Sequence, residues 1–173
     1  MTDTANSAML DSPGGKNLVD YEVKVCLPTD LSAAELGICI AIIQNGDAVN
    51  LESVKRELPN ATSLALALCK GQIVGVGAVK RLRTAYAKSI IRKSGADFPP
   101  ETLELGYVAV DPAHRMRGLS HRIVQLLLSE REDRLFATTS TPAMKRVLTR
   151  VGFAQRGNEW LGTHSQLSCW VRE

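Results

Sequence analysis

Short stretches in which hydrophobic and polar residues alternate recur along the chain and predict the strands of a sheet. Tyr21, Val23 and Val25 alternate with their neighbours, and Pro28 follows them, which predicts a first strand. Two further stretches meet at Lys70-Gly71, a dipeptide that favours a tight turn between strands. The full set of predicted strands covers residues 21–26, 62–70, 72–82, 102–110, 135–139, 153–160 and 166–171.

Hydrophobic residues at helical spacing predict helices between these strands. Ser32-Ala-Ala-Glu35 has the spacing of a capping box and opens a helical run to Ile43, which Asn45-Gly46 ends. A short helix is predicted over 51–58, and the segment 84–100 is ambiguous between a helix and irregular structure.

Two more helices are predicted in the second half of the chain. Leu119, Ile123, Leu126 and Leu127 form a hydrophobic stripe within a helix predicted over 117–130. The last helix has Thr141 as its N-cap, Pro142 at its first position and Gly152 at the left-handed position after its end. The order of elements is that of a mixed α/β domain.

The composition is that of a soluble globular protein. Of the 173 residues, 45% are hydrophobic and 23% are charged. We interpret residues 1–19 as a flexible tail and residues 20–173 as a single domain. Hydrophobic runs are too short to span a membrane and no secretory signal is seen, so we expect a cytoplasmic protein. Four scattered cysteines predict no metal site, and we expect reduced, buried thiols.

Positive charge is concentrated in one segment. The net charge is only +3, too little to indicate nucleic-acid binding by itself. Residues 80–98 nevertheless hold six basic residues against a single acid, Asp97. The segment is either a solvated surface or a surface that meets an anionic substrate or partner. The six are Lys80, Arg81, Arg83, Lys88, Arg92 and Lys93.

The stretch from Glu104 to Ser120 carries the clearest chemical signal. A predicted strand is followed by a turn and by Gly118, which stands where a helix begins. Unpaired N–H groups and the helix dipole make a helix start an anion site, and glycine lets a phosphate approach closely. Arg115 and Arg117 add positive charge. The stretch therefore indicates a phosphate or pyrophosphate ligand, although an ordinary strand-loop-helix would have the same pattern.

The same residues resemble the GNAT superfamily of acetyltransferases. Arg115-Met-Arg-Gly118-Leu-Ser120 is similar to its acetyl-CoA signature, [Q/R]-x-x-G-x-[G/A], except that Ser120 replaces the usual glycine or alanine. Val147-Leu-Thr-Arg-Val-Gly152-Phe153 resembles the helix end that in this family commonly closes on Gly-Phe. The resemblance is strong over residues 101–155 and implies an α/β (α+β) GNAT fold. That fold is a mixed, mostly antiparallel sheet, split at two central parallel strands and flanked by helices.

The resemblance also implies roles for individual residues. Acetyl-CoA would enter the split, and the backbone of strand residues 108–110 would pair with its pantetheine arm. Amides of the loop and helix start would hold the pyrophosphate, and the 138–141 run would lie beside the cofactor. The implied cofactor-binding residues are Val108, Ala109, Val110, Arg115, Met116, Arg117, Gly118, Leu119, Ser120 and Thr141.

Glu104 is the candidate general base. It lies eleven residues before Arg115, where several members of the family place such a glutamate. A carboxylate can take the proton that an amine must lose before it attacks a thioester. Without a bulge, Glu104 would lie on the same side of the strand as Val108 and Val110. A polar residue without a catalytic role is the alternative.

The family's usual acid, a tyrosine, is absent. Leu148 stands at its position, where we expect it to pack against Phe153. Tyr107 and Tyr86 are possible substitutes as proton donors to the CoA thiolate, as is water.

The favoured function is N-acetyl transfer from acetyl-CoA to a primary amine by direct attack, with no metal. The expected substrate is a small-molecule or peptide amine. We expect the protein to be a monomer or a homodimer and to have no membrane partner. Three alternatives remain open. One is a GNAT-fold protein that binds acyl-CoA without catalysis, and another is an enzyme acting on an RNA-linked amine such as aminoacyl-tRNA. The third is an unrelated phosphate-binding module.

Overall fold

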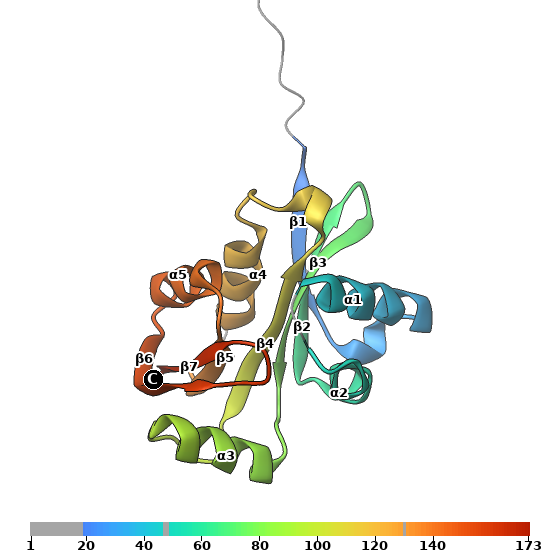
Figure 1. Cartoon of the computed structure of the whole chain (residues 1–173). Helices are drawn as coiled ribbons and strands as arrows, with labels where there is room; N and C mark the ends of the chain where they lie inside the picture. The colour runs from blue at the N-terminus through green and yellow to red at the C-terminus, as the bar shows by residue number, and fades with distance from the viewer. Residues whose placement is uncertain (1–18, 47–48, 130) are drawn as a thin grey trace, which may run out of the picture.

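The computed structural model describes residues 19–46, 49–129 and 131–173, which form one seven-stranded sheet flanked by helices (Figure 1). The predicted tail, 1–19, lies outside the described residues apart from Val19. The strand order across the sheet is β1-β2-β3-β4-β5-β7-β6. The strands are β1 (Tyr21–Cys26), β2 (Ser63–Cys69), β3 (Gln72–Lys80), β4 (Leu103–Val110), β5 (Leu135–Thr139), β6 (Ala154–Leu161) and β7 (Gln166–Arg172).

Five α-helices are present in the described part of the chain. They are α1 (Ala33–Gly46), α2 (Leu51–Glu57), α3 (Thr84–Ser94), α4 (Leu119–Leu128) and α5 (Pro142–Arg150). The ambiguous segment 84–100 thus contains a helix, which ends where Gly95 takes a left-handed conformation with φ 72°. No helix of residues 19–46, 49–129 and 131–173 is long and apolar enough to cross a membrane.

Local signals fix several element ends as predicted. The Glu35 carboxylate accepts from the Ser32 amide at 2.8 Å, and the Ser32 hydroxyl accepts from the Glu35 amide at 3.2 Å, which completes the capping box. The Thr141 hydroxyl accepts from the Met144 amide and caps α5. One prediction is wrong by two residues: α4 begins at Leu119 rather than at residue 117, because Gly118 has φ 71° and cannot be part of the helix.

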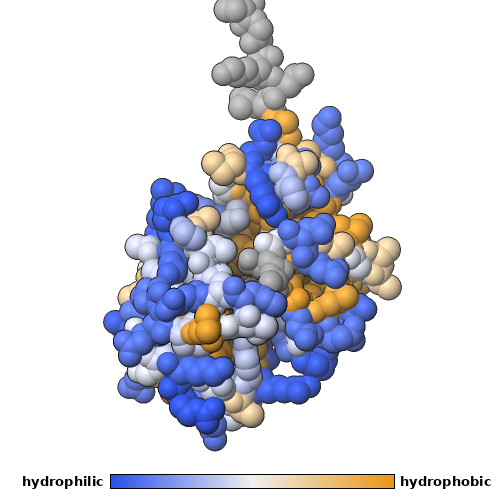
Figure 2. Space-filling model, viewed as in Figure 1, coloured by the Kyte–Doolittle hydropathy of each residue, from blue (hydrophilic) through white to orange (hydrophobic). Residues whose placement is uncertain are grey.

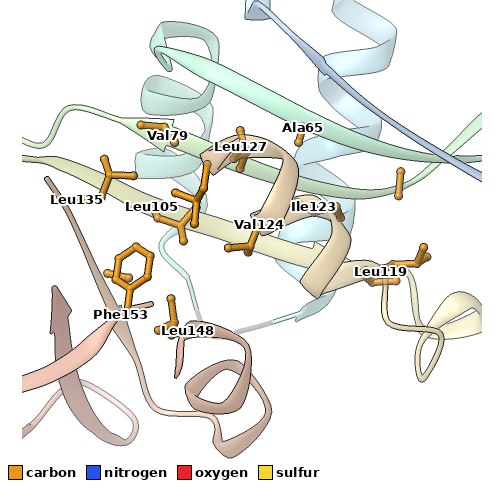
Figure 3. Close-up of a cluster of buried hydrophobic side chains, with 14 of the residues drawn as sticks. Ala65, Val79, Leu105, Leu119, Ile123, Val124, Leu127, Leu135, Leu148 and Phe153 are labelled. Atoms are coloured by element: carbon orange, nitrogen blue, oxygen red, sulfur yellow. The ribbon is translucent and has the colours of Figure 1, made fainter. Parts of the chain in front are cut away.

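Each face of the sheet has its own hydrophobic core. On one face α4 and α5 pack over the central strands, and on the other α1 and α2 cover β2 to β4 (Figure 1). The third cluster lies under α3, where Phe98 stacks on Phe136 with ring centroids 4.5 Å apart. Leu148 is fully buried in the α4–α5 core together with Phe153, as predicted (Figure 3).

The cysteines only partly match the expectation of buried thiols. All four are free; Cys39 and Cys169 are buried, while Cys26 and Cys69 are half-buried. Burial raises the pKa of the Cys39 and Cys169 thiols to about 12, so both stay protonated at neutral pH.

The sheet splits between β4 and β5, as the resemblance to the GNAT superfamily implied. These two strands run parallel and pair only at Leu103 with Leu135 and at Glu104 with Phe136. Beyond Glu104 they diverge, so the rest of β4 has β3 on one edge and, among the described residues, no strand on the other. The two halves of the sheet therefore meet at a gap that opens toward the end of β4.

A bulge in β4 changes which residues share a face. Ala78 pairs with Gly106 and Val76 pairs with Ala109, so β4 has one residue more than β3 between these pairs. Tyr107 absorbs the change with φ 54°. Glu104 and Val108 therefore point to opposite faces of the sheet, and the expectation that they share a side is wrong because of this bulge.

Candidate active site

A cavity of roughly 600 Å³ opens at the split in the sheet. Its walls come from the β4 backbone after Glu104, the end of β5, helices α2 and α3, and the loop of residues 162–165 between β6 and β7. The chemically active side chains that line it are Arg56, Glu57, Lys80, Arg83, Tyr86, Glu104, Tyr107, Thr138, Thr139, Ser140 and His164.

Lys80 lies at the centre of a buried ion-pair network in this cavity. Its Nζ is 2.5 Å from Glu104 Oε2 and 3.1 Å from Glu57 Oε2. Lys80 and Glu104 are paired across β3 and β4, and their side chains are 6% and 9% exposed. No hydrogen bond of regular geometry from the described part of the chain reaches Glu104 Oε2, so the contact with Lys80 is a close ion pair.

The network holds its charges at neutral pH. Burial alone would lower the pKa of Lys80, but the carboxylates of Glu104 and Glu57 outweigh it and raise that pKa above its ordinary value. Burial alone would raise the pKa of Glu57, but the hydrogen bond from Tyr107 and the charge of Lys80 outweigh it and lower that pKa. Lys80 is therefore cationic and Glu57 anionic.

Tyr107 is held in its unusual conformation by the same network. Its hydroxyl donates to Glu57 Oε2 at 2.6 Å, and Lys80 Nζ lies 4.4 Å from the centre of its ring. A left-handed backbone at a bulky residue costs about 1–3 kcal/mol, which these contacts offset. Burial and the bond to Glu57 raise the pKa of Tyr107 above its ordinary value, so its hydroxyl keeps its proton.

The basic segment divides into one buried and five exposed residues. Lys80 was expected to lie on a surface, either solvated or facing an anionic partner. It is instead buried in the network, because it pairs across the sheet with Glu104. The other five basic residues are exposed, and of these only Arg83 lines the cavity.

The outer edge of β4 presents backbone groups to the gap. The Asp111 amide donates to Val74 O at 2.8 Å, toward β3. Backbone groups alternate in direction along a strand, so those of Ala109 also face β3, while those of Val108 and Val110 face the gap. The Val110 carbonyl already accepts from Arg115 Nε at 3.1 Å, which leaves its N–H open.

The loop of residues 111–118 joins β4 to α4 and lies at the opposite end of β4 from Glu104 (Figure 1). Met116 and Gly118 have φ 61° and 71°, and Met116 is fully exposed. The first helical hydrogen bond runs from the Arg122 amide to Gly118 O, so the N–H groups of the preceding turn have no partner within the helix. Leu119 is buried in the core and offers only its backbone.

Two expected roles look different in the structure. Thr141 caps α5 and does not line the cavity, whereas the three residues before it do. Arg115 uses its guanidinium internally, donating to Val110 O and Asn45 O.

Sequence reasoning missed Glu57 and the 162–165 loop. Glu57 lies in a helix of mixed charge with no motif around it, and it meets Tyr107, which is 50 residues away in the chain. Only its place at the end of a predicted helix could have drawn attention to it. The loop carries Thr163, His164 and Ser165 to the cavity and follows no recognisable pattern.

Comparisons with known proteins identify the family and the fold. The family model described as "Acetyltransferase (GNAT) family" matches residues 42–153. No curated protein sequence matched the chain. A GNAT acetyltransferase structure from Streptococcus agalactiae superposes with a TM-score of 0.66 at 13% identity, covering 87% of this chain and 94% of that one.

Two further structures share the fold. A GNAT acetyltransferase from Elizabethkingia anophelis with acetyl-CoA bound has a TM-score of 0.59 at 12% identity, covering 88% of this chain and 97% of that one. FeeM, an N-acyl amino acid synthase from uncultured soil microbes, has a TM-score of 0.62 at 16% identity, covering 88% and 90%. At these identities the solved structures show the fold alone. The family model matches residues 42–153, which include the split in the sheet and the loop before α4, and it shows that the chain belongs to the GNAT acetyltransferase family.

Proposed function

We propose that the protein is an N-acetyltransferase that moves an acetyl group from acetyl-CoA to a primary amine. The observation that carries the proposal is the split sheet, with its open β4 edge joining two sites. At one end lies a helix start with unpartnered N–H groups, and at the other a cavity with two carboxylates. Membership of the GNAT family supports acyl transfer as the reaction.

The residues present fit acetyl-CoA. The N–H groups at the start of α4 suit a pyrophosphate, with Arg117 adding positive charge. From Val110 to Glu104 the strand spans about 20 Å, a length that an extended pantetheine arm can follow. Along it, the Val110 N–H and the Val108 carbonyl face the gap and could pair with the arm as a further strand would, while the Val110 carbonyl is already taken by Arg115.

The reaction is a direct displacement. The amine nitrogen attacks the thioester carbonyl carbon, the C–S bond breaks, and the sulfur leaves as a thiolate that takes up a proton. The amine proton passes to Glu104, directly or through a water molecule. The Val108 amide, next to the bulge, is placed to stabilise the negative charge that develops on the carbonyl oxygen.

Lys80 fixes the position of Glu104. Its Nζ lies 2.5 Å from Oε2, which anchors the carboxylate where the split in the sheet begins. From there a proton taken from the amine can pass on through water to bulk solvent.

Protonation of the thiolate falls to water or to Tyr86 rather than to Leu148 or Tyr107. Leu148 has no proton to give, and Tyr107 is a poor donor because its pKa is raised and its hydroxyl is bound to Glu57. Tyr86 lines the cavity but is more than half exposed.

Binding and turnover test the proposal separately. Native mass spectrometry and calorimetry should detect a complex with acetyl-CoA, and release of free thiol should be detected when amines are added. Desulfo-CoA, which lacks the sulfur, is the matched ligand control and should bind without turnover. Binding without turnover across a broad amine panel would favour a protein that only binds acyl-CoA, and failure to bind any CoA ester would remove the proposal.

A further inference from the structure

We propose that the acceptor is an amino acid or a similarly small molecule, in which the primary amine is accompanied by a carboxylate. The amine would lie over the floor formed by Glu57 and Glu104, and the carboxylate would lie against Arg83, assisted by Arg56. This inference rests on the proposed function and specifies its substrate class.

The charges that line the cavity carry the inference. Three cations, Arg56, Lys80 and Arg83, stand against two carboxylates, Glu57 and Glu104. A molecule with amines alone would enter a site whose charged lining is net positive. A zwitterion can place its ammonium on the carboxylates and its carboxylate on the arginines, so both of its charges are matched.

The cations are not equivalent. Lys80 is buried and already held by both carboxylates. Arg56 is partly engaged, since its Nη2 lies 3.2 Å from Glu57 Oε1 and 3.3 Å from Ser53 Oγ, yet its side chain is 47% exposed. Arg83 makes no side-chain hydrogen bond or ion pair with any residue that the structure describes, and it does not cap α3. Arg83 is therefore the cation available to a ligand.

The phosphates of the cosubstrate do not account for these arginines. The helix start that suits a pyrophosphate follows the far end of β4, about 20 Å from Glu104 along the strand. Arg83 follows β3, whose last residue, Lys80, pairs with Glu104. The arginines thus lie at the end of the cavity where the acceptor and the thioester would meet.

The size of the cavity limits the acceptor. Roughly 600 Å³ is within the usual range for a small-molecule site and must also hold the end of the pantetheine arm. A cavity of this size suits a zwitterion as small as an amino acid better than a large acceptor. A nucleic acid could contact only the exposed part of the basic segment outside the cavity.

A three-member acceptor series tests the charge requirement. Each amino acid is compared with its carboxamide and with the amine that remains when the carboxylate is removed. All are assayed for thiol release, and the amino acids are also titrated calorimetrically into the protein saturated with CoA. We expect kcat/KM for the best amino acid to exceed that of its carboxamide at least tenfold, with measurable binding in the titration.

Arg83→Gln and Arg92→Gln provide a matched pair of variants. Both remove one exposed arginine from the same region, but only Arg83 lines the cavity. Arg83→Gln should weaken calorimetric binding of the amino acid at least fivefold and reduce the preference over the carboxamide. Arg92→Gln should leave both unchanged, and acetyl-CoA affinity should be unaffected in either variant.

The outcomes separate this inference from the proposed function. Equal or faster transfer to carboxamides or diamines would overturn the inference and leave acetyl transfer standing. So would an Arg83→Gln variant with an unchanged preference, and so would transfer to none of the amino acids. Failure to bind acetyl-CoA would instead remove the proposed function itself.

Discussion

Glu104 and Lys80 face each other across β4 and β3, and each determines what the other can do. Lys80 stays charged in a buried position only because two carboxylates surround it. Glu104 in turn is held by Lys80 at the point where the split begins. A substitution at either residue therefore changes both the chemistry and the stability of the cavity.

Glu104→Gln tests the proposed general base. The amide keeps the shape but cannot take a proton, so kcat should fall by about 10²–10⁴ while acetyl-CoA affinity changes little. The loss should shrink at high pH, where more of the amine is already neutral. Steady-state kinetics across pH measure both effects.

Two controls accompany this variant. Glu101→Gln changes an exposed glutamate just before β4 and should have normal kcat. Chemical unfolding of Glu104→Gln is needed because Lys80 loses one of its two partners, which should lower stability by about 1–3 kcal/mol. Near-normal turnover of a folded Glu104→Gln enzyme would exclude Glu104 as the base.

Leu148→Ala tests the assignment of this residue to the core. Its side chain is fully buried beside Phe153, so truncation should lower the free energy of unfolding by about 2–4 kcal/mol (Figure 3). Leu148→Met, which conserves volume, should cost much less. An alanine variant of normal stability but lost activity would mean that Leu148 contacts substrate.

Among the elements, those specified by local signals could be predicted and those specified by distant contacts could not. Alternation, capping residues and the Lys70-Gly71 turn act over a few residues, and the structure has the corresponding strands and helices. The bulge at Tyr107 in β4 could not be predicted, because the conformation of Tyr107 depends on its contact with Glu57 in α2, 50 residues away in the chain. For the same reason the sequence indicated Glu104 but not its partners.

The loop before α4 both starts this helix and forms the proposed binding site for the pyrophosphate of acetyl-CoA. Gly118 has φ 71°, and a Cβ added there would meet no protein atom within 4 Å. Gly118→Val should be strained in this conformation and should also hinder an approaching phosphate. Calorimetry should show acetyl-CoA affinity lowered at least about tenfold, or about 1.4 kcal/mol.

Gly118→Asn separates strain from obstruction. Asparagine tolerates the left-handed conformation, so this variant should keep normal stability. If a side chain here obstructs a phosphate, acetyl-CoA binding should still weaken. Normal affinity in both folded variants would show that no phosphate approaches Gly118.

At the scale of the whole molecule, the sheet is two halves joined by very few pairs, with charge and hydrophobic contacts supporting the junction. β4 and β5 share two residue pairs, and the Glu57–Lys80–Glu104 network lies beside them. Hydrophilic residues cover most of the face seen in Figure 2, with hydrophobic residues gathered on the side of α1. Val25 in β1, Leu27 just after it and Ile38 in α1 are exposed hydrophobic residues.

The pH dependence of stability should report the network. The pKa of Glu57 is lowered on folding from an ordinary value of 4.5, so its contribution is present above about pH 4.5 and is lost as pH falls below it. The pKa of Lys80 is raised from 10.5, so its contribution is lost only as pH rises beyond that value.

Urea unfolding of the wild type and of Glu57→Gln between pH 3 and pH 8 tests this dependence. The wild type should be more stable at neutral pH, and the difference should shrink as the solution is made more acidic. Glu52→Gln, which changes an exposed glutamate of the same helix, should show little difference at any pH. A Glu57→Gln deficit that persists unchanged at pH 3 would contradict the assignment.

The open edge of β4 has a consequence for how the free protein behaves over time. An unpaired edge is a template for pairing with other chains, and here it lies in the middle of the sheet. Amide hydrogens of Val108 and Val110 should exchange with solvent faster than that of Ala109, which faces β3. A ligand paired along this edge should slow their exchange and, at a hundred times its Kd, stabilise the fold by about 2.7 kcal/mol. The concentration of such a ligand would then set how long each copy of the protein resists aggregation.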